Sequence, residues 1–235
     1  MAFRYPIALD LVGRRCVVLG GDAKAEQRVE ALLDGEADVV VVAAEFSEGL
    51  ERLGAGGRVE LVRRDYAPGD LAGAVLGLAV TEDPELRAAA FSEAERSGVL
   101  LNALDDPSHC HFAVPAILRR GDLTVAISTA GKAPALAKRL RQDLGELLGE
   151  ELGALVEALS DVRTAAMAER RVDFDTWARR WQVALGEGLA DLVVEGRMEE
   201  AKATVRAALD GAPASSEGGR PLLGPDRRAQ PSPEV

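Results

Sequence analysis

The chain has 235 residues, of which 47% are hydrophobic and 29% charged, and its formal net charge is −11. This size allows one or two domains with buried cores. The acidic balance argues against nonspecific nucleic-acid binding, and no apolar run is long enough to span a membrane. No signal-peptide pattern opens the sequence, and its two cysteines, Cys16 and Cys110, are far apart. These features favour a protein of the reducing cytoplasm over a protein that is held together by disulfides.

Up to about Asn102, apolar β-branched runs alternate with amphipathic segments. Continuous apolar strands that alternate with helices are typical of a parallel sheet covered by helices on both faces. The sequence therefore predicts an α/β fold of the Rossmann type. The expected strands are residues 14–20, 37–44, 58–64, 75–81 and 99–104, and the expected helices are residues 23–35 and 83–98.

From Phe112 the pattern changes. Residues 112–129 predict two strands joined by a turn at Gly121, and residues 133–149 predict a helix. Residues 151–209 have helical periodicity throughout. Residues 211–235 are rich in proline, glycine and serine, which predicts a disordered tail.

The segment "CVVLGGDAKAEQRVEALL" contains Gly20-x-Asp22-x-x-Ala25 between a predicted strand and a helix. Such a turn binds a dinucleotide pyrophosphate at the helix N-terminus, and the second motif position is normally glycine. Asp22 in that position should weaken binding by crowding the phosphate with like charge, and Lys24 would partly offset it. Glu45 is a candidate partner for the ribose, although an acid in such a loop is common by chance. The alternative is an α/β protein whose first turn merely contains two glycines.

The middle of the chain is more specific than the glycine turn. It contains Asn102, Asp105 and Pro107, followed by Phe112-x-x-Pro115. After these come Arg120-Gly121-Asp122-Leu123, Ala126-Ile127-Ser128-Thr129 and Gly131-x-x-Pro134. In this order, the motifs resemble the siroheme synthase N-terminal family of precorrin-2 dehydrogenases, some of which are also sirohydrochlorin ferrochelatases. The resemblance runs from Tyr5 to about Leu209.

The resemblance implies an NAD-binding Rossmann domain over residues 1–111, a small α+β dimerisation region over 112–149 and a helical domain over 150–210. It also implies a homodimer, with an active site between the first two parts and contributions from both chains. The expected partners are the tetrapyrroles precorrin-2 and sirohydrochlorin, with Fe²⁺ as a further substrate and without nucleic acid or membrane.

Family roles fall on individual residues of this chain. The essential acid falls on Asp105, and the alternative is that Asp105-Asp106-Pro107 is only a turn, because aspartate before proline is ordinary turn chemistry. The neighbouring substitution Asp106→Asn is expected to be nearly silent. The chain departs from the family at Asp22 and Ala130, both of which replace glycine. Expected cofactor contacts are Gly20, Gly21, Asp22, Ala23, Lys24, Ala44, Glu45 and Thr81, and expected substrate contacts are Asn102, Ser128, Thr129 and Lys132.

The sequence "HCH" holds both histidines, His109 and His111. Imidazole suits divalent iron, so these residues are candidates for metal handling, although loop histidines without metal are commoner and no third ligand is obvious. Cys110 is expected to be inert. A basic stretch between Arg119 and Arg141 could pair with the substrate carboxylates, or its last part could be the solvated face of a helix.

The sequence thus predicts NAD⁺-dependent oxidation of precorrin-2 to sirohydrochlorin, with iron insertion as an additional activity. The alternatives are a family member that acts only as a chelatase, and a noncatalytic protein that binds tetrapyrroles. Titration with NAD⁺ separates the dehydrogenase from both alternatives.

Overall fold

The computed structural model describes residues 5–169, 172–186 and 189–212. The chain divides into two compact units, residues 1–114 and 115–235, and each unit is described by itself. The predicted tail lies outside the described residues from position 213 onwards. None of the described helices is both long enough and apolar enough to cross a membrane.

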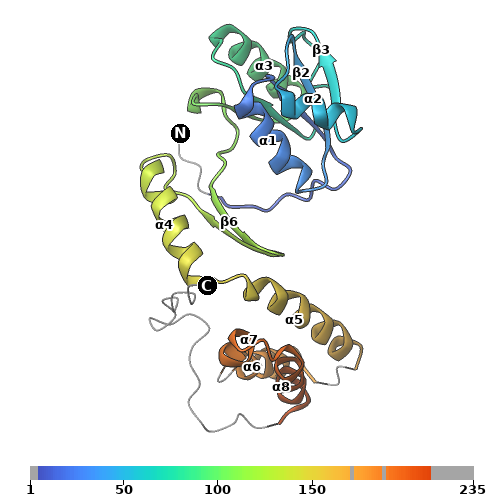
Figure 1. Cartoon of the computed structure of the whole chain (residues 1–235), viewed down its shortest axis with the longest axis vertical. Helices are drawn as coiled ribbons and strands as arrows, with labels where there is room; N and C mark the ends of the chain where they lie inside the picture. The colour runs from blue at the N-terminus through green and yellow to red at the C-terminus, as the bar shows by residue number, and fades with distance from the viewer. Residues whose placement is uncertain (1–4, 170–171, 187–188, 213–235) are drawn as a thin grey trace, which may run out of the picture. The chain divides into compact units, whose positions relative to one another are not determined.

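The first unit is built on a five-stranded parallel sheet with the order β3-β2-β1-β4-β5 (Figure 1). This order reverses between β1 and β4, which makes the carboxyl ends of these two strands the expected ligand crevice. The predicted Rossmann-type class is confirmed. The strands are β1 (Arg15–Leu19), β2 (Asp38–Ala43), β3 (Glu60–Arg63), β4 (Leu76–Ala79) and β5 (Leu100–Ala103).

Alternate residues of the central strands feed two separate cores, one on each face of the sheet. Cys16, Val18, Val39 and Val41 pack against α1 (Ala23–Leu33) and α2 (Glu48–Ala55). On the other face, strand residues pack against α3 (Pro84–Ser97) and the connection from β3 to β4. Burial on both faces explains why the strands have continuous rather than alternating apolar sequences. The members of the second core that come from β1 and β2 are Val17, Leu19, Val40 and Val42.

Helix α2 was not among the predicted elements. Its sequence, EGLERLGA, has only eight residues and two glycines, so its intrinsic propensity is poor. The helix forms because Ser47 caps its first turn and Leu50 is completely buried in the core. Tertiary packing therefore decides the structure of this segment.

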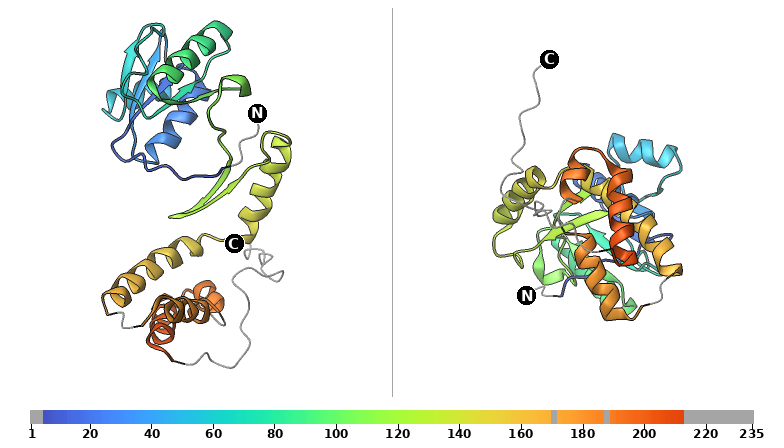
Figure 2. Two further views of the ribbon diagram at one scale, coloured as in Figure 1. Left: turned by 180° about the vertical axis from the view of Figure 1, so that it is seen from behind. Right: turned by 90° about the horizontal axis from the view of Figure 1, so that it is seen from below.

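The second unit begins with an antiparallel hairpin of β6 (Ala116–Arg120) and β7 (Leu123–Ile127), and both strands contact α4 (Pro134–Leu147) (Figures 1 and 2). The described part of the predicted helical segment 151–209 contains four helices. Two of them lie within residues 173–196. The helices are α5 (Glu151–Ala168), α6 (Phe174–Ala184), α7 (Leu189–Val194) and α8 (Met198–Asp210).

One face of the hairpin joins the core of the second unit. Leu118 is buried in this core, and Leu123 and Val125 pack against it. Side chains alternate between the faces of a strand, so the pairs Ile117–Ala126 and Arg119–Thr124 lie on the opposite face, where they are exposed. The hairpin thus presents one exposed face and two strand edges without a partner among the described residues.

Candidate functional site

The turn after β1 requires both of its glycines. Gly20 has a left-handed φ of +134°, and a Cβ atom there would lie 2.1 Å from the Val80 carbonyl oxygen. A Cβ atom on Gly21 would lie 1.9 Å from the carbonyl oxygen of Glu45. The turn is therefore held directly against the ends of β4 and β2, at the crevice where the strand order reverses.

Asp22 has a structural role that the sequence motif did not reveal. It is the N-cap of α1, and its Oδ1 atom accepts a hydrogen bond from the Ala25 amide at 2.9 Å. The amides of Ala23 and Lys24 occupy the first turn, where helix geometry leaves N–H groups without a partner inside the helix. These amides can donate to a phosphate, but the Asp22 carboxylate shares the same positive helix end.

The loop after β2 is anchored to the glycine turn. The Ser47 amide donates to the Gly21 carbonyl oxygen at 2.7 Å, and the Ser47 hydroxyl donates to Glu26 at 2.5 Å. Ala44 and Glu45 remain exposed in this loop. A carboxylate at this position suits the ribose 2′-hydroxyl of NAD and would repel the 2′-phosphate of NADP. Glycines, free amides and an acid after β2 together fit a dinucleotide.

The loops after β4 and β5 bring two further predicted residues to the same edge. Thr81 follows β4, and its hydroxyl accepts a hydrogen bond from the Asp83 amide at 3.1 Å. Lys24 of α1 forms an ion pair of 3.5 Å with Glu82 in this loop. Asp105 follows β5, is exposed, and has a left-handed φ of +57°, which is uncommon outside glycine but tolerated by aspartate.

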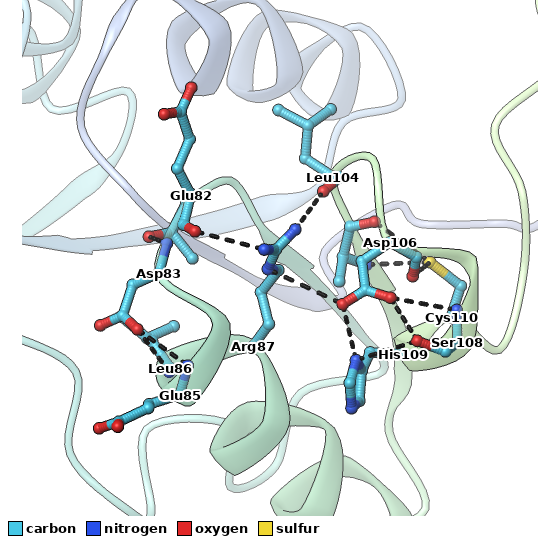
Figure 3. Close-up of polar contacts among 12 residues, drawn as sticks. Glu82, Asp83, Glu85, Leu86, Arg87, Leu104, Asp106, Ser108, His109 and Cys110 are labelled. Carbon is cyan, nitrogen blue, oxygen red and sulfur yellow. Dashed lines mark hydrogen bonds and ion pairs between the residues drawn. The ribbon is translucent and has the colours of Figure 1, made fainter.

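Asp106 is engaged in the fold, in contrast to the expectation that it is silent (Figure 3). Its carboxylate accepts hydrogen bonds from the Ser108 amide at 3.2 Å and the Ser108 hydroxyl, and it lies 2.7 Å from His109 Nδ1. The hydrogen bonds from Ser108, and next those from His109, lower the pKa of Asp106 to about 2. Asp106 thereby caps the short 3₁₀ helix Pro107–His109.

Arg87 of α3 was missed by the sequence analysis. Its Nη1 atom donates to the Leu104 carbonyl oxygen and its Nη2 atom to the Glu82 carbonyl oxygen, both at 3.3 Å. Its Nε atom lies 3.8 Å from Asp106 Oδ2 (Figure 3). The arginine looked like one polar residue of an amphipathic helix, and no local pattern distinguishes it from a solvated side chain.

The "HCH" residues have structural partners. His111 Nδ1 accepts a hydrogen bond from the Leu101 amide at 3.0 Å, and its Nε2 atom lies 2.5 Å from Glu95. Because His109 contacts Asp106, the imidazole rings of both histidines stabilise the loop after β5. The described residues include no group of three His, Cys, Asp or Glu side chains that could hold a metal ion. The geometry therefore gives no support to metal handling by these histidines.

Two neighbours of the histidines also hold the loop together. Cys110 is buried, and burial raises the pKa of its thiol, which keeps it protonated and unreactive. Asn102 Nδ2 donates to the Phe112 carbonyl oxygen at 2.8 Å, a contact within the chain itself. The substrate role expected for Asn102 therefore has a structural alternative.

The remaining predicted substrate residues lie in the second unit, between β7 and α4. The Ser128 hydroxyl accepts from the Ala130 amide, and the Thr129 hydroxyl accepts from the Ala133 amide. Ala130 has a left-handed φ of +52°, a conformation that glycine adopts at lower cost than alanine. Lys132 is exposed beside them.

Arg120, part of the basic stretch, has a structural role. Its Nε donates to the Leu148 carbonyl oxygen at 2.8 Å and its Nη2 to the Gly145 carbonyl oxygen at 2.9 Å. These bonds satisfy carbonyl groups at the C-terminal end of α4. Arg139 forms an ion pair with Asp143 one turn later on α4, as the solvated-face alternative predicted.

The strand order, the glycine turn and the acidic loop after β2 define a dinucleotide-binding protein of the Rossmann class. Residues 7–116 match a family model described as putative NAD(P)-binding, which confirms the cofactor prediction for this domain. Residues 120–147 match the model of the central part of sirohaem biosynthesis proteins. These two matches confirm the resemblance of the chain to the siroheme synthase N-terminal family.

Individual relatives agree with this assignment. The chain is 35% identical to siroheme synthase 1 of Serratia proteamaculans over 219 residues, which are 91% of this chain and 44% of the relative. It is 34% identical to the siroheme synthase of Chromobacterium violaceum, with coverage of 94% and 47% respectively. The chain thus spans less than half the length of these curated relatives.

A solved structure covers the chain more evenly. The precorrin-2 dehydrogenase SirC is 25% identical and superposes with a TM-score of 0.63, covering 89% of this chain and 98% of that one. The likeness therefore includes both units and is not limited to the Rossmann sheet.

Proposed function

We propose that this protein oxidises precorrin-2 to sirohydrochlorin and reduces NAD⁺ to NADH. The likeness to a precorrin-2 dehydrogenase over nearly its whole length supports the substrate. The observation that carries the proposal is Asp105, an exposed carboxylate at the cofactor edge of the sheet. Its neighbour Asp106 is bound within the fold, so Asp105 is the acid that is available for chemistry.

The reaction removes a hydride and a proton from the macrocycle. NAD⁺, when bound, would supply the hydride acceptor, and the Asp105 carboxylate would accept the proton as a general base and later release it to water. The first-turn amides of α1 would hold the pyrophosphate, and Glu45 would hold the ribose and thereby select NAD over NADP. Ser128, Thr129 and Lys132 would donate hydrogen bonds to substrate carboxylates.

Anaerobic turnover of precorrin-2 with NAD⁺, followed by NADH absorbance, tests this function. Asp105→Asn should lower kcat by about 100-fold or more because the general base is lost. NAD⁺ affinity and thermal stability should barely change, since asparagine tolerates a left-handed φ as well as aspartate does. Normal turnover by Asp105→Asn would exclude this acid as the base.

Glu36 provides a matched control for Asp105. It is also an exposed acid with a left-handed φ, +55°, but it precedes β2 and so lies at the opposite edge of the sheet. Glu36→Gln should leave turnover unchanged. Loss of activity in both variants would indicate that charge at a strained turn matters for folding and not for proton transfer.

We also propose that the protein is a cytoplasmic homodimer. The exposed hairpin face includes Ile117, and α4 of the same unit carries Leu136 and Leu140, which are one turn apart and 51% and 39% exposed. A two-stranded hairpin is marginal by itself, and a second copy could cover its face and pair its edges. Two buried free thiols support a reducing compartment.

Insertion of Fe²⁺ into sirohydrochlorin is the second candidate activity, because the curated relatives are named siroheme synthases. Asp105 could accept pyrrole protons as iron enters. Anaerobic addition of Fe²⁺ after complete oxidation tests it by the absorbance change of the macrocycle. If the chain does not oxidise precorrin-2 but inserts Fe²⁺ into supplied sirohydrochlorin, the chelatase-only alternative is supported, whereas macrocycle binding without either reaction would support the carrier.

A further inference from the structure

Arg87 lies one turn inside α3, beneath the loops that follow β4 and β5. Its side chain is 18% exposed, so most of it is enclosed by the protein. The guanidinium reaches one loop through the Glu82 carbonyl oxygen and the other through the Leu104 carbonyl oxygen (Figure 3). A single planar group therefore joins the segment that carries Thr81 to the segment that carries Asp105.

The bond to Leu104 acts directly on Asp105. The Leu104 carbonyl oxygen belongs to the peptide plane that includes the Asp105 amide, and the orientation of this plane helps set φ at Asp105. That φ is +57°, in a region where nearby backbone conformations are sterically forbidden. Holding the plane therefore fixes the direction in which the Asp105 side chain leaves the backbone.

The third guanidinium nitrogen of Arg87, Nε, shows that the contacts of this side chain are not optimised for stability. Arg87 Nε is buried and has no hydrogen-bond partner among the described residues, and the nearest acid oxygen, on Asp106, is 3.8 Å away. A buried donor without a partner is unfavourable. The buried position of Arg87 is better explained by the two loops that its terminal nitrogens hold in place.

We propose that Arg87 is a positioning residue that fixes the Asp105 carboxylate relative to the cofactor edge of the sheet. The inference rests on the proposed dehydrogenase function and adds to it the residue that sets the geometry of proton transfer. A catalytic group misplaced by about 1 Å can lose about 100-fold in rate, so a clamp of this kind has a measurable effect.

Steady-state kinetics of the full chain with precorrin-2 and NAD⁺ test the proposal. Arg87→Gln should lower kcat by about 10- to 100-fold and leave both KM values within about twofold, because the residue touches neither ligand. Arg96→Gln is the matched control, since Arg96 is exposed in the last turn of the same helix. It should leave kcat unchanged.

A double-mutant cycle separates positioning from general destabilisation. In a chain that already carries Asp105→Asn, Arg87→Gln should change kcat by less than about twofold, because the base that it positions is absent. If kcat of the double variant is lowered by the product of the two single-variant factors, the proposal is wrong. A wild-type kcat in Arg87→Gln would also overturn it. If Arg87→Gln does not fold, Arg87→Lys, which can reach only one carbonyl, takes its place in the same cycle.

Amide hydrogen exchange gives a readout that needs no activity. The Asp106 amide donates to the Ala103 carbonyl oxygen at 3.3 Å, and the His109 amide to the Asp106 carbonyl oxygen at 3.1 Å. Both amides should exchange at least about tenfold faster in Arg87→Gln than in the wild type, and their exchange rates should be unchanged in Arg96→Gln. Unchanged exchange in Arg87→Gln refutes the clamp. Wild-type protein without precorrin-2 turnover refutes only the dehydrogenase function, and exchange still tests the clamp.

Discussion

Asp105 and Asp106 are adjacent in the chain and have opposite environments. Asp105 is exposed at a left-handed position, whereas Asp106 accepts hydrogen bonds from Ser108 and lies against His109. The sequence singled out Asp105 through a family motif. It could not show that Asp106 anchors the loop, because "LDDP" describes any aspartate-rich turn equally well. At the scale of single residues, hydrogen-bond partners in the fold decide which carboxylate is structural and which is available for chemistry.

The low pKa of Asp106 predicts a pH-dependent contribution to stability. Because the folded-state pKa, about 2, lies below the usual 3.8, the charged form stabilises the fold above about pH 4. This contribution is lost as pH falls from about 4 to 2. Asp106→Asn should therefore lower the free energy of unfolding at pH 7 by about 1 kcal/mol, a value reduced for solvent screening. Urea unfolding at pH 7, 5 and 3 should show this deficit shrinking, and a deficit that is constant with pH would contradict the explanation.

Asp22→Gly addresses the departure from the glycine motif. Removing the carboxylate from the N-terminus of α1 should tighten NAD⁺ binding about tenfold, or about 1.4 kcal/mol, because the phosphates no longer share the helix end with an anion. Loss of the cap to glycine should cost only a few tenths of a kcal/mol. Isothermal titration with NAD⁺ measures the first effect and thermal unfolding the second.

A second N-cap controls for the loss of capping alone. Asp173 of α6 accepts from the Thr176 amide at 2.9 Å, the same distance as in Asp22, but it lies in the other unit. Asp173→Gly should lose similar stability without any gain in NAD⁺ affinity. Unchanged or weaker binding in Asp22→Gly would mean that the carboxylate does not compete with the phosphates.

Helix α3 organises the first unit through two side chains that point to different loops. Arg87 holds the loops at the carboxyl edge, and Glu93, only 6% exposed, holds the connection between β3 and β4. The sequence predicted α3 well, because its Asp83 cap, Pro84 and terminal Gly98 mark both ends. It could not predict that a glutamate in this helix is buried, because its partners are 22 to 27 residues away.

Glu93→Gln should destabilise the first unit. The carboxylate accepts hydrogen bonds from Tyr66 Oη at 2.5 Å and from the Gly69 and Leu71 amides at 3.0 and 2.9 Å. A glutamine places an NH₂ group against donors, so about 2 kcal/mol of unfolding free energy should be lost. Glu85→Gln, at an exposed position of α3, should lose less than about 0.5 kcal/mol. Equal losses in denaturant melts would mean that the buried network adds nothing.

At the scale of the whole molecule, the sequence predicted the secondary structure of each unit better than it predicted the boundaries between domains. The Rossmann sheet and the helical C-terminal part followed from hydrophobic periodicity, and the hairpin followed from a glycine turn. The boundary between dimerisation region and helical domain stays a prediction, since Leu118 of β6 and Leu152 of α5 share one core. Such contacts join residues that are distant in the chain, which local patterns cannot reveal.

The proposed homodimer predicts that Leu136→Lys lowers the native mass. A charge on the exposed apolar row of α4 would have to be buried without a partner in a dimer, so monomer should predominate at micromolar concentration. Light scattering during size-exclusion chromatography measures this mass. Val183→Lys, at an exposed apolar position of α6, is the control and should leave the mass unchanged. A dimer that persists in Leu136→Lys would place its interface elsewhere.

The distribution of cysteine and tryptophan gives the chain two independent spectroscopic reporters. Both cysteines are buried in the first unit, and burial, together with the nearby Asp38 charge, raises the pKa of Cys16 to about 11. Both tryptophans, Trp177 and Trp181, lie in the second unit with their rings 6.1 Å apart. Maleimide labelling therefore reports opening of the first unit, and intrinsic fluorescence reports unfolding of the second. The wild-type chain can thus reveal, without any mutation, whether its two units unfold in one cooperative transition.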